Sequence, residues 1–257
     1  MCLKKYSLLI CATLASYAVS AQADEQHGHT DKIIDTFLAC DNQFFEQLAD
    51  NKTLFNEYID LTTEENVTFI PVKSVVEPDK YTATFKKALS YRGLTITGYQ
   101  NIYIPTALSG QFYYWGFIFD NSEDEIKKAL SEIKWNGYNT DVYIANSKIY
   151  NSNTKVWQDN PYSIDGVIPK QGTVEKSLYL EPFTDNQNRI MCSIQGDVKK
   201  SILYASRPDM RPIDIKLEGE RREKSEALRI QKERQKAPET QTNSTPKNNI
   251  PKDGDNI

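Results

Sequence analysis

The chain has 257 residues, of which 35 are Asp or Glu and 31 are Lys or Arg, giving a formal net charge of −4. The acidic excess lies before residue 213, so the main part of the chain lacks the basic surface that binding to a phosphate backbone requires. Composition therefore excludes nucleic acid as an expected partner. The length suits one domain with one core.

The first 23 residues predict a secretory signal peptide. Lys4 and Lys5 precede an apolar run from Leu8 to Val19, and small residues follow it. Cleavage after Ala21 or after Ala23 would satisfy the small-x-small rule. The apolar run is shorter than the roughly 20 residues of a membrane span. We therefore expect a soluble periplasmic or secreted protein without membrane insertion after cleavage.

Residues 24–35, DEQHGHTDKIID, are polar and predict a flexible leader. His27 and His29 stand among acidic residues there and could hold a metal loosely. A tight site needs ligands that other groups fix in place, and a flexible leader does not provide them. We expect neither a metal site nor a cofactor.

The globular domain is expected over residues 36–212, which carry nearly all aromatic residues and strand-like runs. Asp41 can cap a helix that begins at Asn42, and β-branched and aromatic residues predict strands over 67–72, 82–89 and 93–104. The apolar run 112–119 predicts a central strand covered on both faces. Ser122 and Glu125 form a capping-box pattern that starts a helix over 122–133.

Further strands are expected over 142–150, 174–180 and 190–195, and a short helix through residues 201–203 is expected to end at Arg207-Pro208. These periodicities predict a single α+β domain with a mainly antiparallel sheet and helices on one face.

A charged, low-complexity tail is expected over residues 213–257. Its first part alternates charge sign and could form a solvated helix. From Pro238 onward the composition is typical of disorder. The leucines and isoleucines in the tail do not form a heptad seam, so no coiled coil is predicted.

The cysteines of the domain predict a disulfide. Cys2 and Cys11 would leave with the signal peptide, so the mature chain keeps Cys40 and Cys192, both at positions that face an apolar interior. Two cysteines in an oxidising compartment are expected to pair. The alternatives are two buried free thiols, or a nucleophile, which would need a nearby histidine as base. The only two histidines lie in the predicted leader.

Aromatic residues mixed with asparagines in the stretch 135–162 predict a candidate partner surface. Tyrosine and tryptophan offer a flat apolar face with one polar tip, which suits protein interfaces and sugar stacking. A sheet-rich domain is rich in tyrosine in any case. The candidate residues are Trp135, Tyr138, Tyr143, Tyr150, Trp157 and Tyr162.

Motifs for catalysis are weak. Ser131 and Lys134 match the S-x-x-K pattern of serine acyl enzymes, but the accompanying motifs of those enzymes are absent from the sequence. A pair of carboxylates such as Asp120 and Glu181 could serve a glycosidase if a cleft brought them within about 5–10 Å. We therefore predict an exported binding protein without catalytic residues that engages another envelope protein, as inhibitor, immunity factor or assembly accessory. The alternative is a cell-envelope hydrolase that uses a carboxylate pair.

Overall fold

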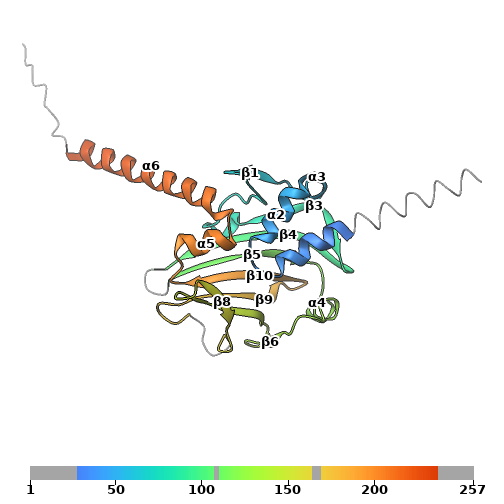
Figure 1. The fold of residues 1–257 in the computed structure, drawn as a ribbon. Helices are drawn as coiled ribbons and strands as arrows, with labels where there is room; N and C mark the ends of the chain where they lie inside the picture. The colour runs from blue at the N-terminus through green and yellow to red at the C-terminus, as the bar shows by residue number, and fades with distance from the viewer. Residues whose placement is uncertain (1–27, 107–109, 164–168, 237–257) are drawn as a thin grey trace, which may run out of the picture. The chain divides into compact units, whose positions relative to one another are not determined.

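The computed structural model describes residues 28–106, 110–163 and 169–236, and its centre is one antiparallel sheet of eight strands. The path of the sheet (Figure 1) runs through β3 (Thr82–Tyr91), β4 (Leu94–Pro105), β5 (Gln111–Phe119), β10 (Gln187–Gly196), β9 (Val174–Thr184), β7 (Tyr143–Asn151) and β6 (Asn136–Gly137), and β8 (Val156–Asp159) pairs with β7. A separate hairpin joins β1 (Thr62–Glu64) and β2 (Val67–Phe69). The α+β class with an antiparallel sheet is confirmed.

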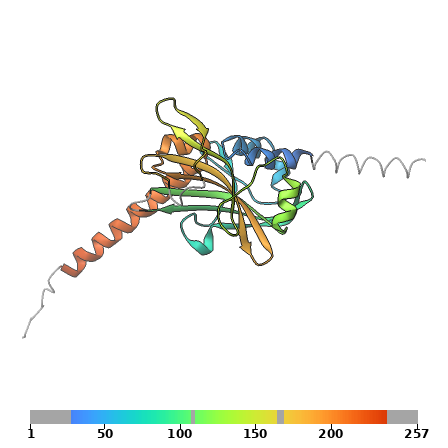
Figure 2. The same cartoon turned by 90° about the horizontal axis from the view of Figure 1, so that it is seen from below.

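Helices cover one side of this sheet, as Figures 1 and 2 show for the N-terminal helices and α5. The described helices of the domain are a first helix over residues 28–37, α2 (Gln43–Asp50), α3 (Lys52–Phe55), α4 (Glu123–Ala129) and α5 (Lys200–Ser206), together with a 3-10 turn at Pro78–Lys80. Among the described residues, no α-helix covers the other side of the central strands in these views, and the 3-10 turn at Pro78–Lys80 lies on that side. The two faces of the sheet therefore offer different surroundings.

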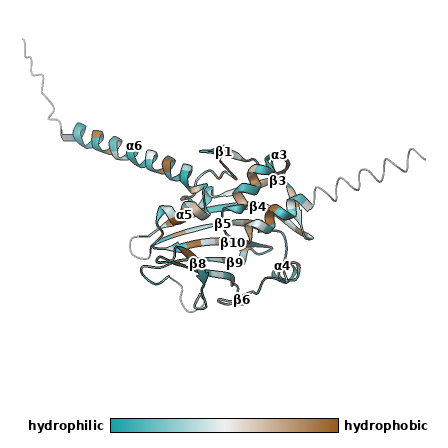
Figure 3. Cartoon of the chain, viewed as in Figure 1, coloured by the Kyte–Doolittle hydropathy of each residue, from teal (hydrophilic) through white to brown (hydrophobic). Residues whose placement is uncertain are grey.

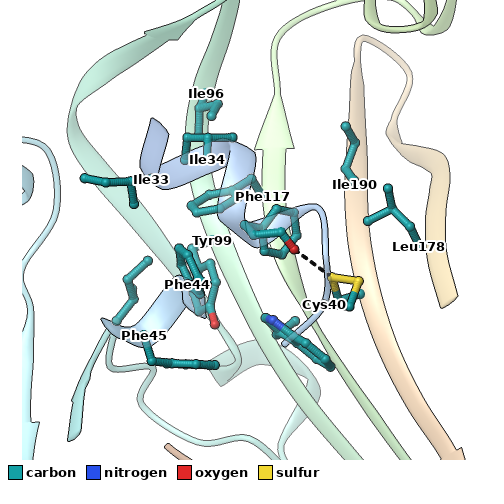
Figure 4. Close-up of a cluster of buried hydrophobic side chains, with 14 of the residues drawn as sticks. Ile33, Ile34, Cys40, Phe44, Phe45, Ile96, Tyr99, Phe117, Leu178 and Ile190 are labelled. Atoms are coloured by element: carbon teal, nitrogen blue, oxygen red, sulfur yellow. Dashed lines mark hydrogen bonds between the residues drawn. A yellow bond between two sulfur atoms is a disulfide. The ribbon is translucent and has the colours of Figure 1, made fainter. Parts of the chain in front are cut away.

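The core lies between the sheet and these helices (Figure 4). Side chains alternate along each strand, so Trp115 and Phe117 of β5 face the helices. The ring of Phe117 lies 4.9 Å from the ring of Phe37 and 5.8 Å from that of Phe44, both in edge-to-face arrangements. Such aromatic pairs add about 0.5–1.5 kcal/mol each beyond the area they bury. The first helix and α2 are thereby fixed on the centre of the sheet.

Cys40 and Cys192 form a disulfide, as the sequence predicted. Their Cα atoms lie 5.4 Å apart, and both side chains are buried. Cys40 is the last residue of the turn that ends the first helix, and its φ of +53° lies in a region that few non-glycine residues adopt. The bond ties this turn to the middle of β10 (Figure 4).

The prediction of a flexible leader over residues 24–35 is wrong for residues 28–35, which the structure describes. Residues 28–37 form a helix, and Ile33 and Ile34 are completely buried in the core. The packed domain therefore begins before residue 36. Apolar side chains at 33, 34 and 37 lie on one side of a helix. The surrounding residues are polar, so this narrow apolar stripe is not recognisable from composition. The predicted signal peptide and His27 lie outside the described residues.

Several local predictions are confirmed. Ser122 and Glu125 form the capping box of α4, with the Ser122 hydroxyl accepting from the Glu125 amide. The strand β5 lies between β4 and β10 in the interior of the sheet, as predicted, but the predicted cover on both faces is wrong, because the described α-helices lie on one face only. The predicted start of α2 was one residue early, because Asn42 is the N-cap, while the Asp41 carboxylate accepts from the Gln43 amide.

The contacts of the chain divide it between Ile213 and Asp214, within α6 (Met210–Lys236). The second unit, as far as it is described, is a charged helix that is mostly hydrophilic in Figure 3. Arg229 lies 2.7 Å from Glu226 and 3.9 Å from Glu233 along this helix. Residues 237–257 of the predicted tail lie outside the described residues. Within the described part of the chain, no helix is both long and apolar enough to span a membrane.

Candidate functional site

A cavity of about 600 Å³ opens where the β7–β8 hairpin faces α5 and the start of α2. We call it the lysine pocket, because three lysines from separate elements line it. Its lining residues are Asp41, Asn42, Tyr150, Ser152, Lys155, Trp157, Lys176, Lys199, Ser201, Ile202, Ala205 and Ser206. Small-molecule and peptide sites commonly have this size and mix an apolar wall with a few polar groups.

Lys176 is the buried cation of the lysine pocket. It is 8% exposed, and its Nζ lies 3.4 Å from the carbonyl oxygen of Cys40 and 3.5 Å from that of Ala39. The ammonium also lies 5.0 Å from the centre of the Trp157 ring. Burial lowers the pKa of Lys176, the charge of Asp41 opposes this shift, and Lys148 adds to it.

The strand pattern explains why this charge is buried. Val174, Lys176, Leu178 and Leu180 alternate along β9 onto the face that the helices cover. Lys176 is therefore a cation at a position where the pattern demands an apolar side chain. Burying an ammonium is costly unless an anion pairs with it. No carboxylate lies within ion-pair distance of Lys155, Lys176 or Lys199 among the residues that the structure describes.

Tyr150 and Trp157 form the aromatic wall of the lysine pocket. They are directly opposite in the β7–β8 register, and their rings meet edge to face with centres 5.3 Å apart. The hairpin between them turns because the Asn151 side chain accepts from the amides of Asn153 and Thr154. The asparagines that marked this stretch in the sequence therefore build the turn that positions both aromatic side chains.

The structure does not gather all six aromatic residues of the predicted partner surface. Only Tyr150 and Trp157 line the lysine pocket, and Tyr138 lines a second cavity. Trp135 is partly buried against the core, and the Lys127 ammonium lies over the ring of Tyr143. Tyr162 is 73% exposed.

The lysines of the pocket were missed by the sequence analysis. Lys155 and Lys199 are exposed residues in polar segments and carry no signal of their own. Lys176 did carry one, since it interrupts the apolar positions of β9. Their convergence depends on how the folded chain places the hairpin and α5 on opposite sides of one cavity, which no local pattern encodes.

The carboxylates considered for hydrolysis have other partners. Glu181 pairs with Arg189, whose Nε lies 2.9 Å from its Oε1. Asp120 accepts from the hydroxyl of Thr97 and from the amide of Gln187. Within the described ranges, no group of three or more His, Cys, Asp or Glu side chains could hold a metal ion.

Comparisons with protein-family models, with curated proteins and with solved structures find no match for this chain. A proposal about its function must therefore rest on its own residues.

Proposed function

We propose that this protein is an exported, non-catalytic binding protein of the cell envelope that engages an acidic segment of another envelope protein in the lysine pocket. Export is supported by the signal-peptide pattern of residues 1–23, and the Cys40–Cys192 disulfide is compatible with an oxidising compartment.

The observation that carries the proposal is the convergence of Lys155, Lys176 and Lys199 on one cavity without an ion-pair partner among the described residues. Each lysine comes from a different element, so the cluster is not a consequence of local composition. Of the described residues that line the cavity, Asp41 is the one carboxylate. A cavity with three cations and one anion favours an anionic occupant.

The rim of the lysine pocket supports a protein as the occupant. Tyr150 and Trp157 provide the aromatic anchor type that dominates protein interfaces. A partner surface that presents a Glu or Asp side chain could place its carboxylate near the lysines and cover this apolar rim.

The first prediction concerns a hexaglutamate peptide with blocked termini, titrated against the protein and followed by tryptophan fluorescence, since Trp157 lines the pocket. We expect saturable binding and a loss of at least about tenfold in affinity for the double variant Lys155→Glu/Lys199→Glu. Each charge reversal turns an attraction of about 1 kcal/mol in water into a repulsion. A change of about 1.4 kcal/mol in the binding free energy corresponds to a tenfold change in affinity.

The matched control is Lys128→Glu/Lys134→Glu, which changes the net charge equally at exposed residues that do not line the pocket. Equal weakening in both double variants would show a general charge effect and contradict the proposal, and so would equal binding of hexaglutamine. If inorganic phosphate bound as tightly as the peptide, the site would take small anions and the partner-protein proposal would fail.

The same titration has an expected pH dependence. Because burial lowers the pKa of Lys176, its charge is lost before that of an ordinary lysine, whose pKa is about 10.4. As the pH is raised, the affinity for the peptide should therefore begin to decrease at a lower pH than the one at which exposed lysines lose their charge. The variant Lys176→Met should bind more weakly at neutral pH and lack this early fall.

A further inference from the structure

The face of the sheet opposite the first helix, α2 and α5 carries a second cavity, of about 380 Å³. We call it the tyrosine pocket. Its lining residues are Tyr81, Ile102, Ile104, Tyr114, Tyr138, Asn139, Val142, Tyr179, Glu181, Arg189, Met191 and Gln195. Alternation along β9 places Tyr179 and Glu181 on the face opposite to Lys176. The tyrosine pocket is therefore separate from the lysine pocket.

Three tyrosine rings meet in the tyrosine pocket. The ring centre of Tyr179 lies 6.4 Å from that of Tyr114 and 6.1 Å from that of Tyr138, and both pairs are close to perpendicular. Met191 and Ile102 are buried apolar residues of the same lining. Rings set at right angles over an apolar lining present flat surfaces in more than one direction.

Planar polar groups lie among these rings. The Tyr114 hydroxyl donates to Gln195 Oε1 at 3.4 Å, and Gln195 Nε2 donates to the Tyr179 hydroxyl at 3.3 Å. Burial raises the pKa of Tyr179 to about 12, so this phenol stays neutral at physiological pH and keeps its proton. Both contacts are long for hydrogen bonds of this kind, so a bound hydroxyl can compete for the same groups.

The ionic groups of the tyrosine pocket balance each other. Arg189 donates from Nε to Glu181 at 2.9 Å and from Nη1 to the Gln100 side-chain oxygen at 2.7 Å. Among the described residues of the lining, these are the one cation and the one carboxylate. The pocket therefore has no net charge, in contrast to the lysine pocket, and a charged ligand would gain little from entering it.

We propose that the tyrosine pocket binds a neutral saccharide. A pyranose ring has an apolar face of C–H groups, which tyrosine rings can cover, and an edge of hydroxyls, which Arg189, Glu181 and Gln195 can bind. The volume lies in the lower part of the range of about 300–1,000 Å³ that is typical of ligand pockets. This inference is independent of the function proposed for the lysine pocket.

The test is a titration of the full mature chain with neutral disaccharides, namely maltose, cellobiose and diacetylchitobiose, followed by NMR or calorimetry. At least one should bind in a saturable way, and Tyr179→Ala should weaken its affinity by about tenfold or more. The matched control Tyr150→Ala removes an aromatic side chain of the lysine pocket and should leave the affinity unchanged. Absence of binding at millimolar concentrations, or equal effects of the two variants, would overturn the proposal.

A second variant separates ligand contact from folding. Glu181→Gln keeps the shape of the side chain but removes the charge that balances Arg189. Binding of glucuronate relative to glucose should then rise by several-fold, whereas glucuronate should bind the unaltered protein no better than glucose. An unchanged ratio in a folded Glu181→Gln protein would contradict the role given to the balanced pair.

Discussion

Replacing both Arg207 and Asp209 should destabilise the protein less than replacing either one alone. Both side chains are essentially unexposed, and two Arg207 nitrogens donate to the two Asp209 oxygens at 2.8 and 2.6 Å. Asn101 accepts from the same guanidinium, which also lies 4.3 Å from the centre of the Trp115 ring. Removing one partner leaves a buried charge unpaired, which costs about 3–5 kcal/mol.

We therefore expect Arg207→Met and Asp209→Leu each to lower the free energy of unfolding in urea by about 3–5 kcal/mol. The double variant Arg207→Met/Asp209→Leu should recover part of that loss. The control is Lys80→Met, since Lys80 and Glu77 form a solvent-exposed pair at 2.7 Å whose loss should leave the free energy of unfolding nearly unchanged. If the two single losses simply added in the double variant, the proposed coupling would be absent.

The second large effect concerns the disulfide. Cys40→Ala and Cys192→Ala should each lower the free energy of unfolding by about 2–5 kcal/mol, and the double variant should cost little more than either. The bond closes a sequence separation of 152 residues, for which the chain-entropy model gives about 5 kcal/mol before any strain.

Peptide mass spectrometry checks the bond itself. Alkylation of the denatured, unreduced protein should label neither Cys40 nor Cys192, and reduction should expose both. Labelling of both residues without reduction would contradict the presence of the bond. A lowered free energy of unfolding in only one of the two alanine variants would contradict its stabilising role.

The elements that the sequence predicted well are those with strong local patterns. The capping box at Ser122 and Glu125 fixes the start of α4 through contacts within one turn. The all-apolar run of β5 correctly indicated an interior strand. The disulfide followed from the cysteine count and from the two faces on which the cysteines lie.

What the sequence could not show depends on packing between distant elements. The helix over residues 28–37 was missed because its apolar residues form a narrow stripe among polar ones. The Arg207-Pro208 pair marks the end of a helix in the sequence, yet the buried guanidinium also donates to the side-chain oxygen of Asn101, which is 106 positions away. The lysine pocket likewise joins β9 to a hairpin and to α5, and only the folded chain brings Lys155, Lys176 and Lys199 together.

The most direct test of the proposed function is site-specific photocrosslinking in cells with p-benzoylphenylalanine at Ser152, which lines the lysine pocket. Tyr162 is the control position, because it is highly exposed but does not line the pocket. We predict one crosslinked envelope protein at Ser152, joined through a segment rich in Asp and Glu, and no such product at Tyr162. The product should disappear in the Lys155→Glu/Lys199→Glu background and persist with Lys128→Glu/Lys134→Glu. The absence of any product at Ser152, or a product that the reversal of the pocket lysines leaves unchanged, would contradict the account.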